Sequence, residues 1–138
     1  MSNVKSATRR YTIRVAALMV TYVILLAVAV GFVDTGRVTG LPAYILAVLP
    51  ALPIIGMFWA IGKFLIEMED EYLRMLQVRQ MIVATCFALA VATVWGFLEE
   101  FELVPFVPAY WVTILWFFGL GIGQVVNKIT TGDSVFNP

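Results

Sequence analysis

The side chains most capable of chemistry lie in a charged segment between two apolar stretches. Its acids and bases are Glu67, Glu69, Asp70, Glu71, Arg74 and Arg79. Carboxylates at this density could bind a divalent cation, although the glycine and alternating oxygen ligands of an EF-hand are absent. Asp70 and Glu71 have the spacing to Arg74 that pairs opposite charges on a helix, and acids are favourable at a helix amino terminus. We expect Asp70, Glu71, Arg74 and Gln77 to form a self-paired cytoplasmic cap or partner contact, with no metal bound.

Two further polar groups flank the apolar stretches. Glu99, Glu100 and Glu102 form an acidic loop that could attract cations or take up protons at low pH, although a short exposed loop explains them equally well. Gln124 and Asn127 lie near the end of the last apolar stretch. Because no charged residue lies at the centre of any stretch, a proton-driven exporter has little support.

Two residue types are scarce enough to exclude whole classes of chemistry. The chain has no histidine, which removes the usual haem and zinc ligand and the commonest general base. Cys86 is the single cysteine, so no intrachain disulfide or CxxC pair can form. We therefore expect no enzyme activity and no cofactor. With nine basic and nine acidic residues, the chain also has no basic surface for nucleic acid.

Four long apolar stretches determine the expected fold. They run over residues 12–33, 43–66, 79–98 and 104–126 of the 138, in a chain that is 62% apolar. About 20 helical residues cross the roughly 30 Å hydrocarbon layer. The sequence predicts an all-α, membrane-spanning four-helix bundle, a single domain over residues 1–138, with the third helix extending into the cytoplasm from about residue 68.

The basic residues predict an orientation for these spans. With a cytoplasmic amino terminus, eight of the nine basic residues lie inside and only Arg37 lies outside. The positive-inside rule then places both termini in the cytoplasm. Aromatic residues near the span ends are expected to act as interfacial anchors; these are Tyr44, Trp59, Trp95, Tyr110 and Trp111.

Two patterns within the spans bear on packing. Pro50 and Pro53 predict a break in the second span, which could be a fixed bend, a hinge or an ion-coordinating site. Small residues recur every four positions in the third span and again in the fourth: Ala84, Ala88, Ala92, Gly96, Gly119 and Gly123. Such patterns let membrane helices approach closely. The spacing does not say whether a helix of the same chain or of another protein fills them.

The second half of the chain, from Glu67 to Val126, resembles a group of small four-span bacterial inner-membrane proteins of unknown function. The likeness rests on Asp70-Glu71-x-x-Arg74-x-x-Gln77, a Gly96-to-Glu99 exit and a tryptophan-containing last span ending in glycines, although the arginine-rich tail of that group is reduced to Lys128. The resemblance implies a bacterial inner membrane and a cytoplasmic helix start.

The leading functional prediction is a non-enzymatic structural or accessory subunit. It would contact membrane lipid and a protein partner, or a second copy of itself. The alternative is a minimal oligomeric transporter or channel that uses the break at Pro50 and Pro53.

Overall fold

The computed structural model describes residues 2–135, which form helices and no β-strand over that range. The elements are α1 (Ser2–Ala29), a π-helical turn η1 (Val30–Asp34), α2 (Leu41–Val48), α3 (Ala51–Glu67), α4 (Glu71–Glu100) and α5 (Tyr110–Thr131). Four of the resulting helical segments are long and apolar enough to cross a membrane: Asn3–Asp34, Leu41–Glu67, Glu71–Glu100 and Tyr110–Thr131. This confirms the four apolar helices predicted from hydropathy.

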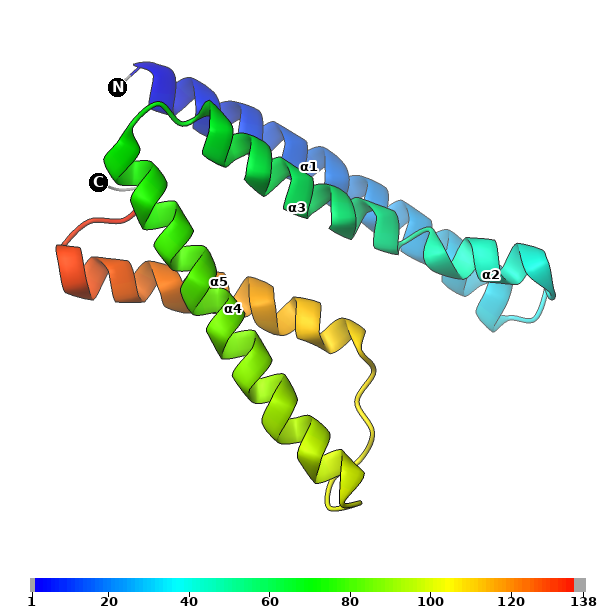
Figure 1. Cartoon of the computed structure of the whole chain (residues 1–138). Coiled ribbons are helices and arrows are strands. Elements are labelled where there is room, and N and C mark those ends of the chain that lie inside the picture. The colour runs from blue at the N-terminus through cyan, green and yellow to red at the C-terminus, as the bar shows by residue number, and fades with distance from the viewer. Residues whose placement is uncertain (1, 136–138) are drawn as a thin grey trace. The chain divides into compact units, whose positions relative to one another are not determined.

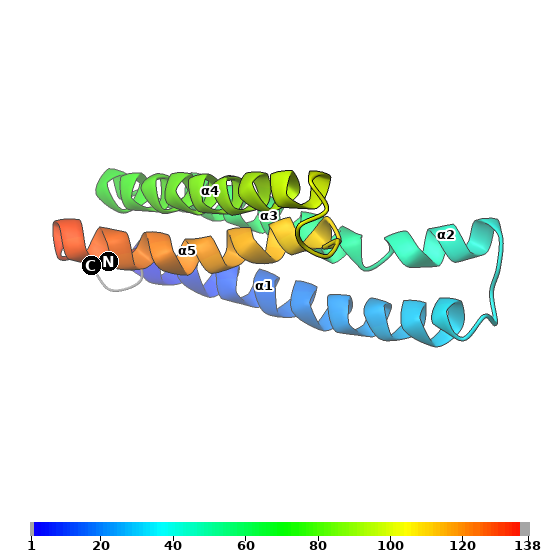
Figure 2. The same ribbon diagram turned by 90° about the horizontal axis from the view of Figure 1, so that it is seen from below.

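The contacts divide the chain into two units, residues 1–69 and 70–138. The first unit is a hairpin in which α2 and α3 return along α1 (Figure 1). The second is a hairpin of α4 and α5, which also lie against each other when the molecule is turned (Figure 2).

The return segment of the first unit is broken between α2 and α3. Leu49 and Pro50 lie outside both helices, and Pro50 has no N–H to donate to the preceding turn. Pro53 falls in the first turn of α3, where the backbone N–H groups need no partner within the helix. The two prolines therefore produce one interruption, at Pro50. Both proline side chains are buried.

Helix α4, the third of the predicted spans, begins at Glu71 and not at residue 68, the start expected from sequence. Residues 68–70 are not helical, and the Asp70 side chain accepts a hydrogen bond from the Leu73 N–H at 3.1 Å. Asp70 is thus the N-cap of α4, because its carboxylate satisfies a free amide of the first turn. α4 then continues to Glu100, so it starts well before the apolar stretch at residues 79–98 and ends just after it.

Helix α5, the fourth of the predicted spans, also begins later than the expected boundary at Val104. Pro105 and Pro108 lie in an irregular segment, and α5 starts only at Tyr110. A proline disfavours helical geometry at the residue before it, so Val104 and Val107 are poor helix positions despite their hydropathy. Glu99 holds this segment, since its Oε1 accepts a hydrogen bond from the Val107 N–H at 2.7 Å.

Candidate functional site

The α4–α5 seam is built on the small residues that the sequence singled out. The buried side chains of α4 follow one stripe: Leu73, Leu76, Gln77, Gln80, Ala84 and Ala88. On α5, a Cβ added to Gly119 would lie 2.8 Å from the Ala84 Cα, and one added to Gly123 would lie 2.6 Å from the Gln80 carbonyl oxygen. The two backbones are therefore in direct contact along this seam.

Close approach allows amide side chains of one helix to reach carbonyls of the other. Gln80 Nε2 donates to the Leu120 carbonyl and Asn127 Nδ2 donates to the Leu76 carbonyl, each at 2.8 Å. The side-chain oxygens of Gln77, Gln80 and Asn127 are buried and accept no hydrogen bond within the described part of the chain. Polar groups thus lie inside a helix contact that is otherwise made of small and apolar residues.

The small-residue face of α4 extends beyond the part that α5 covers. Ala84 and Ala88 are almost fully buried, whereas Ala92 is half-buried and Gly96 is exposed. Ala92 and Gly96 line a groove of about 690 Å³ between the end of α4 and the start of α5. Its other prominent lining residues are Trp95, Glu99, Phe106 and Trp111. The groove is apolar except for Glu99.

The charged segment before α4 takes several separate roles. Asp70 caps the helix, as described above, and Gln77 is buried in the seam with 5% of its surface exposed. Across residues 2–135, the structure contains no group of three His, Cys, Asp or Glu side chains that could hold a metal ion. The pairing of Arg74 with Asp70 or Glu71 stays a prediction.

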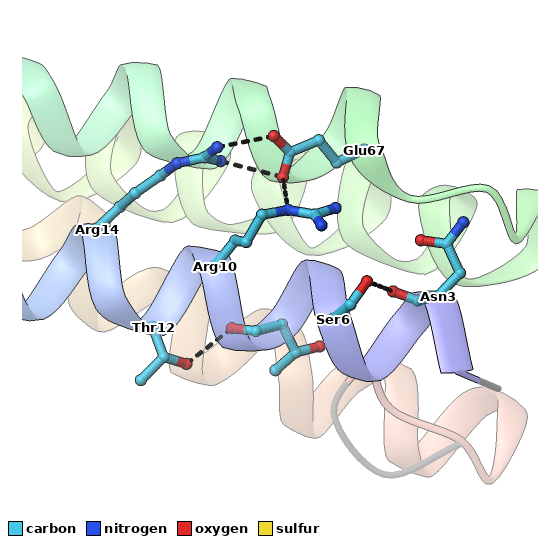
Figure 3. A network of polar contacts seen from close by, with 7 residues as sticks. Asn3, Ser6, Arg10, Thr12, Arg14 and Glu67 are labelled. Carbon is cyan, nitrogen blue, oxygen red and sulfur yellow. Dashed lines mark hydrogen bonds and ion pairs between the residues drawn. The ribbon is translucent and has the colours of Figure 1, made fainter.

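A cluster of basic and aromatic side chains at one end of the first unit was not predicted from sequence. Arg14 makes a bidentate ion pair with Glu67, at 2.8 Å from Nη2 to Oε1 and 3.1 Å from Nη1 to Oε2, and Arg10 Nε lies 3.2 Å from Glu67 Oε2 (Figure 3). The Arg14 guanidinium also lies 5.6 Å from the Trp59 ring centroid, and Lys63 Nζ lies 5.9 Å from it. We call Arg10, Arg14, Trp59, Lys63 and Glu67 the basic cluster.

The basic cluster could have been predicted by assuming that the first two apolar stretches form an antiparallel hairpin. When α3 runs antiparallel to α1, the end of α3 comes back beside the start of α1, so Glu67 faces the arginines near the amino terminus. Composition alone assigned Glu67 to the acidic segment that follows it in sequence. Which arginines pair with Glu67 depends on which turn of α1 lies beside the end of α3. Predicting that turn requires knowing the helix lengths and the position of the break at Pro50.

The remaining predicted positions are not brought together into a site. The acidic loop uses Glu99 to hold the backbone at Val107, while Glu100 and Glu102 are exposed. Cys86 is a free, exposed thiol on α4. Gln124 is half-buried on α5.

The fold and the four apolar segments define the class of the molecule: an all-helical protein with four helices long and apolar enough to cross a membrane. Comparison with known protein families, with curated proteins and with solved structures gives no match.

Proposed function

We propose that this chain is a non-enzymatic membrane protein that acts as a small structural or accessory subunit through helix–helix contacts. The observation that carries the proposal is the groove at Ala92 and Gly96, where the small-residue face of α4 continues past its contact with α5. A lipid tail gains nothing from a small residue, whereas a helix gains van der Waals contact by approaching it closely. The charged start of α4 offers a second, cytoplasmic contact.

The chemistry of the groove fits an apolar helix. Its walls are alanine, glycine and aromatic side chains, and its polar group, Glu99, is already engaged with the backbone at Val107. The helix that fills it would belong to another membrane protein or to a second copy of this chain. Glycine at position 96 has nothing within 4 Å of its would-be Cβ, so the backbone there is open to a partner.

Enlarging the groove residues tests this role. Ala92→Leu and Gly96→Leu should displace the bound helix, while the matched control Val94→Leu, at a position 62% exposed on the same helix, should not. The measurement is the mass of the assembly released in mild detergent, which separates a heteromeric partner from a homo-oligomer. If both groove variants keep the parental mass, or if the parent is a monomer, the accessory role is excluded.

We place the protein in the bacterial inner membrane with both termini in the cytoplasm. The support is the eight-to-one distribution of basic residues and the resemblance of residues 67–126 to small inner-membrane proteins. Reporter fusions at Pro138 and within the loop at residues 35–40 should give cytoplasmic and periplasmic signals, respectively. A periplasmic signal at Pro138 would overturn this topology.

The interruption between α2 and α3 favours a second candidate, a minimal oligomeric transporter or channel. Broken helices line ion sites in many transporters. Here both prolines are buried, and the neighbouring exposed side chain, Leu52, is apolar. A fixed bend explains these features without a polar path, so we rank transport second. Ion flux through proteoliposomes that contain the purified protein would reverse this order.

A further inference from the structure

We propose that the basic cluster binds the phosphate of an anionic phospholipid headgroup. This inference rests on α1 and α3 crossing the membrane and is independent of the accessory role proposed above. Its ligand is a lipid of the surrounding bilayer, whereas the groove on α4 would take a protein helix.

The charges of the cluster do not balance. Arg10, Arg14 and Lys63 bring three positive charges together, and Glu67 brings one negative charge. Within the described residues, no other carboxylate forms an ion pair with these cations. The cluster therefore keeps a positive excess that attracts an anion.

Glu67 arranges the guanidinium groups and leaves part of them available. It occupies the two terminal nitrogens of Arg14, but it contacts only Nε of Arg10. The terminal nitrogens of Arg10 remain for a further acceptor (Figure 3). The Arg10 side chain is 47% exposed. Guanidinium groups bind phosphate oxygens through paired hydrogen bonds, so an arginine already held in place is a suitable phosphate donor.

The position of the basic cluster along α1 and α3 favours a lipid headgroup as its ligand. The apolar run of α1 begins at Val15, directly after Arg14, and that of α3 ends at Gly62, directly before Lys63. Both limits place the cluster at the level of the headgroups. Trp59 is 57% exposed and lies one helical turn before Lys63, as expected for an interfacial anchor with a charge above it.

This combination distinguishes a phospholipid from free phosphate. A lipid presents its phosphate at this depth and its glycerol and upper acyl carbons beside Trp59. Free phosphate would use the basic groups alone. Basic groups near an anionic membrane surface each strengthen binding, and clusters of them recognise lipid headgroups.

The test measures which lipids stay with the protein. The full-length chain is reconstituted in nanodiscs of phosphatidylcholine and phosphatidylglycerol, and retained lipids are counted by native mass spectrometry. We expect phosphatidylglycerol to be enriched on the parent protein. Arg10→Gln and Lys63→Gln should each lower this enrichment by about five-fold. Lys63→Gln leaves the ion pairs with Glu67 in place, so it reports on headgroup binding without disturbing the helix contact.

The matched control is Arg37→Gln, which removes the same charge from the exposed loop at the opposite end of the unit. It should leave the enrichment unchanged. An equal loss in this control, or unchanged enrichment in both cluster variants, would overturn the proposal in favour of general charge attraction. Added millimolar inorganic phosphate provides the second arm: the lipid should remain bound, and its displacement would instead show a free-phosphate site.

Discussion

The two hairpins of this protein hold their helices together in different ways. In the first, large side chains meet: Tyr11 stacks on Phe64 with ring centroids 4.8 Å apart, and Arg14 pairs with Glu67. In the second, glycines of α5 lie directly on the backbone of α4. The first hairpin is held by contacts between large side chains, whereas the second relies on glycines that let the two backbones approach closely.

Glycine shows the difference most directly, because it occurs in both seams. A Cβ added to Gly56 in the first unit would lie 2.9 Å from Leu18 Cδ2, the end of a flexible side chain. A Cβ added to Gly123 would lie 2.6 Å from the Gln80 carbonyl oxygen, which belongs to the backbone of α4. A leucine can change rotamer, but a helix backbone must move as a whole. A methyl group at position 56 can therefore be accommodated by a side-chain movement, whereas one at position 123 requires the two helices to separate.

The largest predicted effect comes from adding one methyl group to the seam of the second hairpin, and the same addition to the first hairpin provides the comparison. Gly123→Ala should lower the free energy of unfolding by about 1–3 kcal/mol, because the backbones must separate. Gly56→Ala should cost much less, since Leu18 can turn aside. Unfolding titrations in mixed detergent micelles measure both. Gly121→Ala is the control on α5, because its Cβ would meet nothing within 4 Å. Equal losses for Gly56 and Gly123 would show that the two seams do not differ in this way.

A smaller effect is expected from removing the aromatic stack of the first hairpin. Phe64→Leu keeps most of the packed volume but removes the stack on Tyr11, which contributes about 0.5–1.5 kcal/mol. Ile55→Ala, at a position 60% exposed on the same helix, serves as the control and should have little effect. The same unfolding titration applies. A Phe64→Leu protein as stable as the Ile55→Ala control would contradict the role of the aromatic stack in this seam.

The smallest effect should follow from removing an amide of the second seam. Asn127→Leu deletes the hydrogen bond to the Leu76 carbonyl, and hydrogen bonds between membrane helices average about 0.6 kcal/mol. The loss is further reduced because the same substitution removes a buried oxygen that accepts no hydrogen bond in the described structure. A loss comparable to that of Gly123→Ala would mean that the amides, and not the close backbone approach, hold α4 and α5 together.

Hydropathy predicted the four apolar helices because the composition of a membrane span determines its length and helical state almost alone. Local backbone chemistry then shifted the boundaries. The carboxylate of Asp70 starts α4 after residue 68, and Pro105 and Pro108 delay the start of α5 beyond Val104. Both signals are visible in the sequence. The absence of Gly, Pro, Ser and Asn from the charged segment favours a helix from about residue 68, and hydropathy favours one from Val104, but neither criterion takes account of these signals.

The contacts of the candidate sites were harder to predict. The spacing of Ala84 and Ala88 indicated a helix contact, yet it did not show that α5 would diverge before reaching Ala92 and Gly96. The partner of Glu67 was missed because Arg10 and Arg14 are distant in sequence. Ion pairs between distant residues depend on where the returning helix ends. In the first hairpin, the loop at residues 35–40 and the break at Pro50 together set where α3 ends beside α1.

Each hairpin is formed by a continuous half of the chain, and this has a consequence for synthesis. α1 to α3 are complete before the first residue of α4 leaves the ribosome, so the first hairpin can close while the second is still being made. At about 5–20 residues per second, the remaining chain takes several seconds to appear, far longer than the roughly microsecond formation of a helix. The first hairpin, which is held by aromatic and charged side chains, can therefore form before the second has been synthesised.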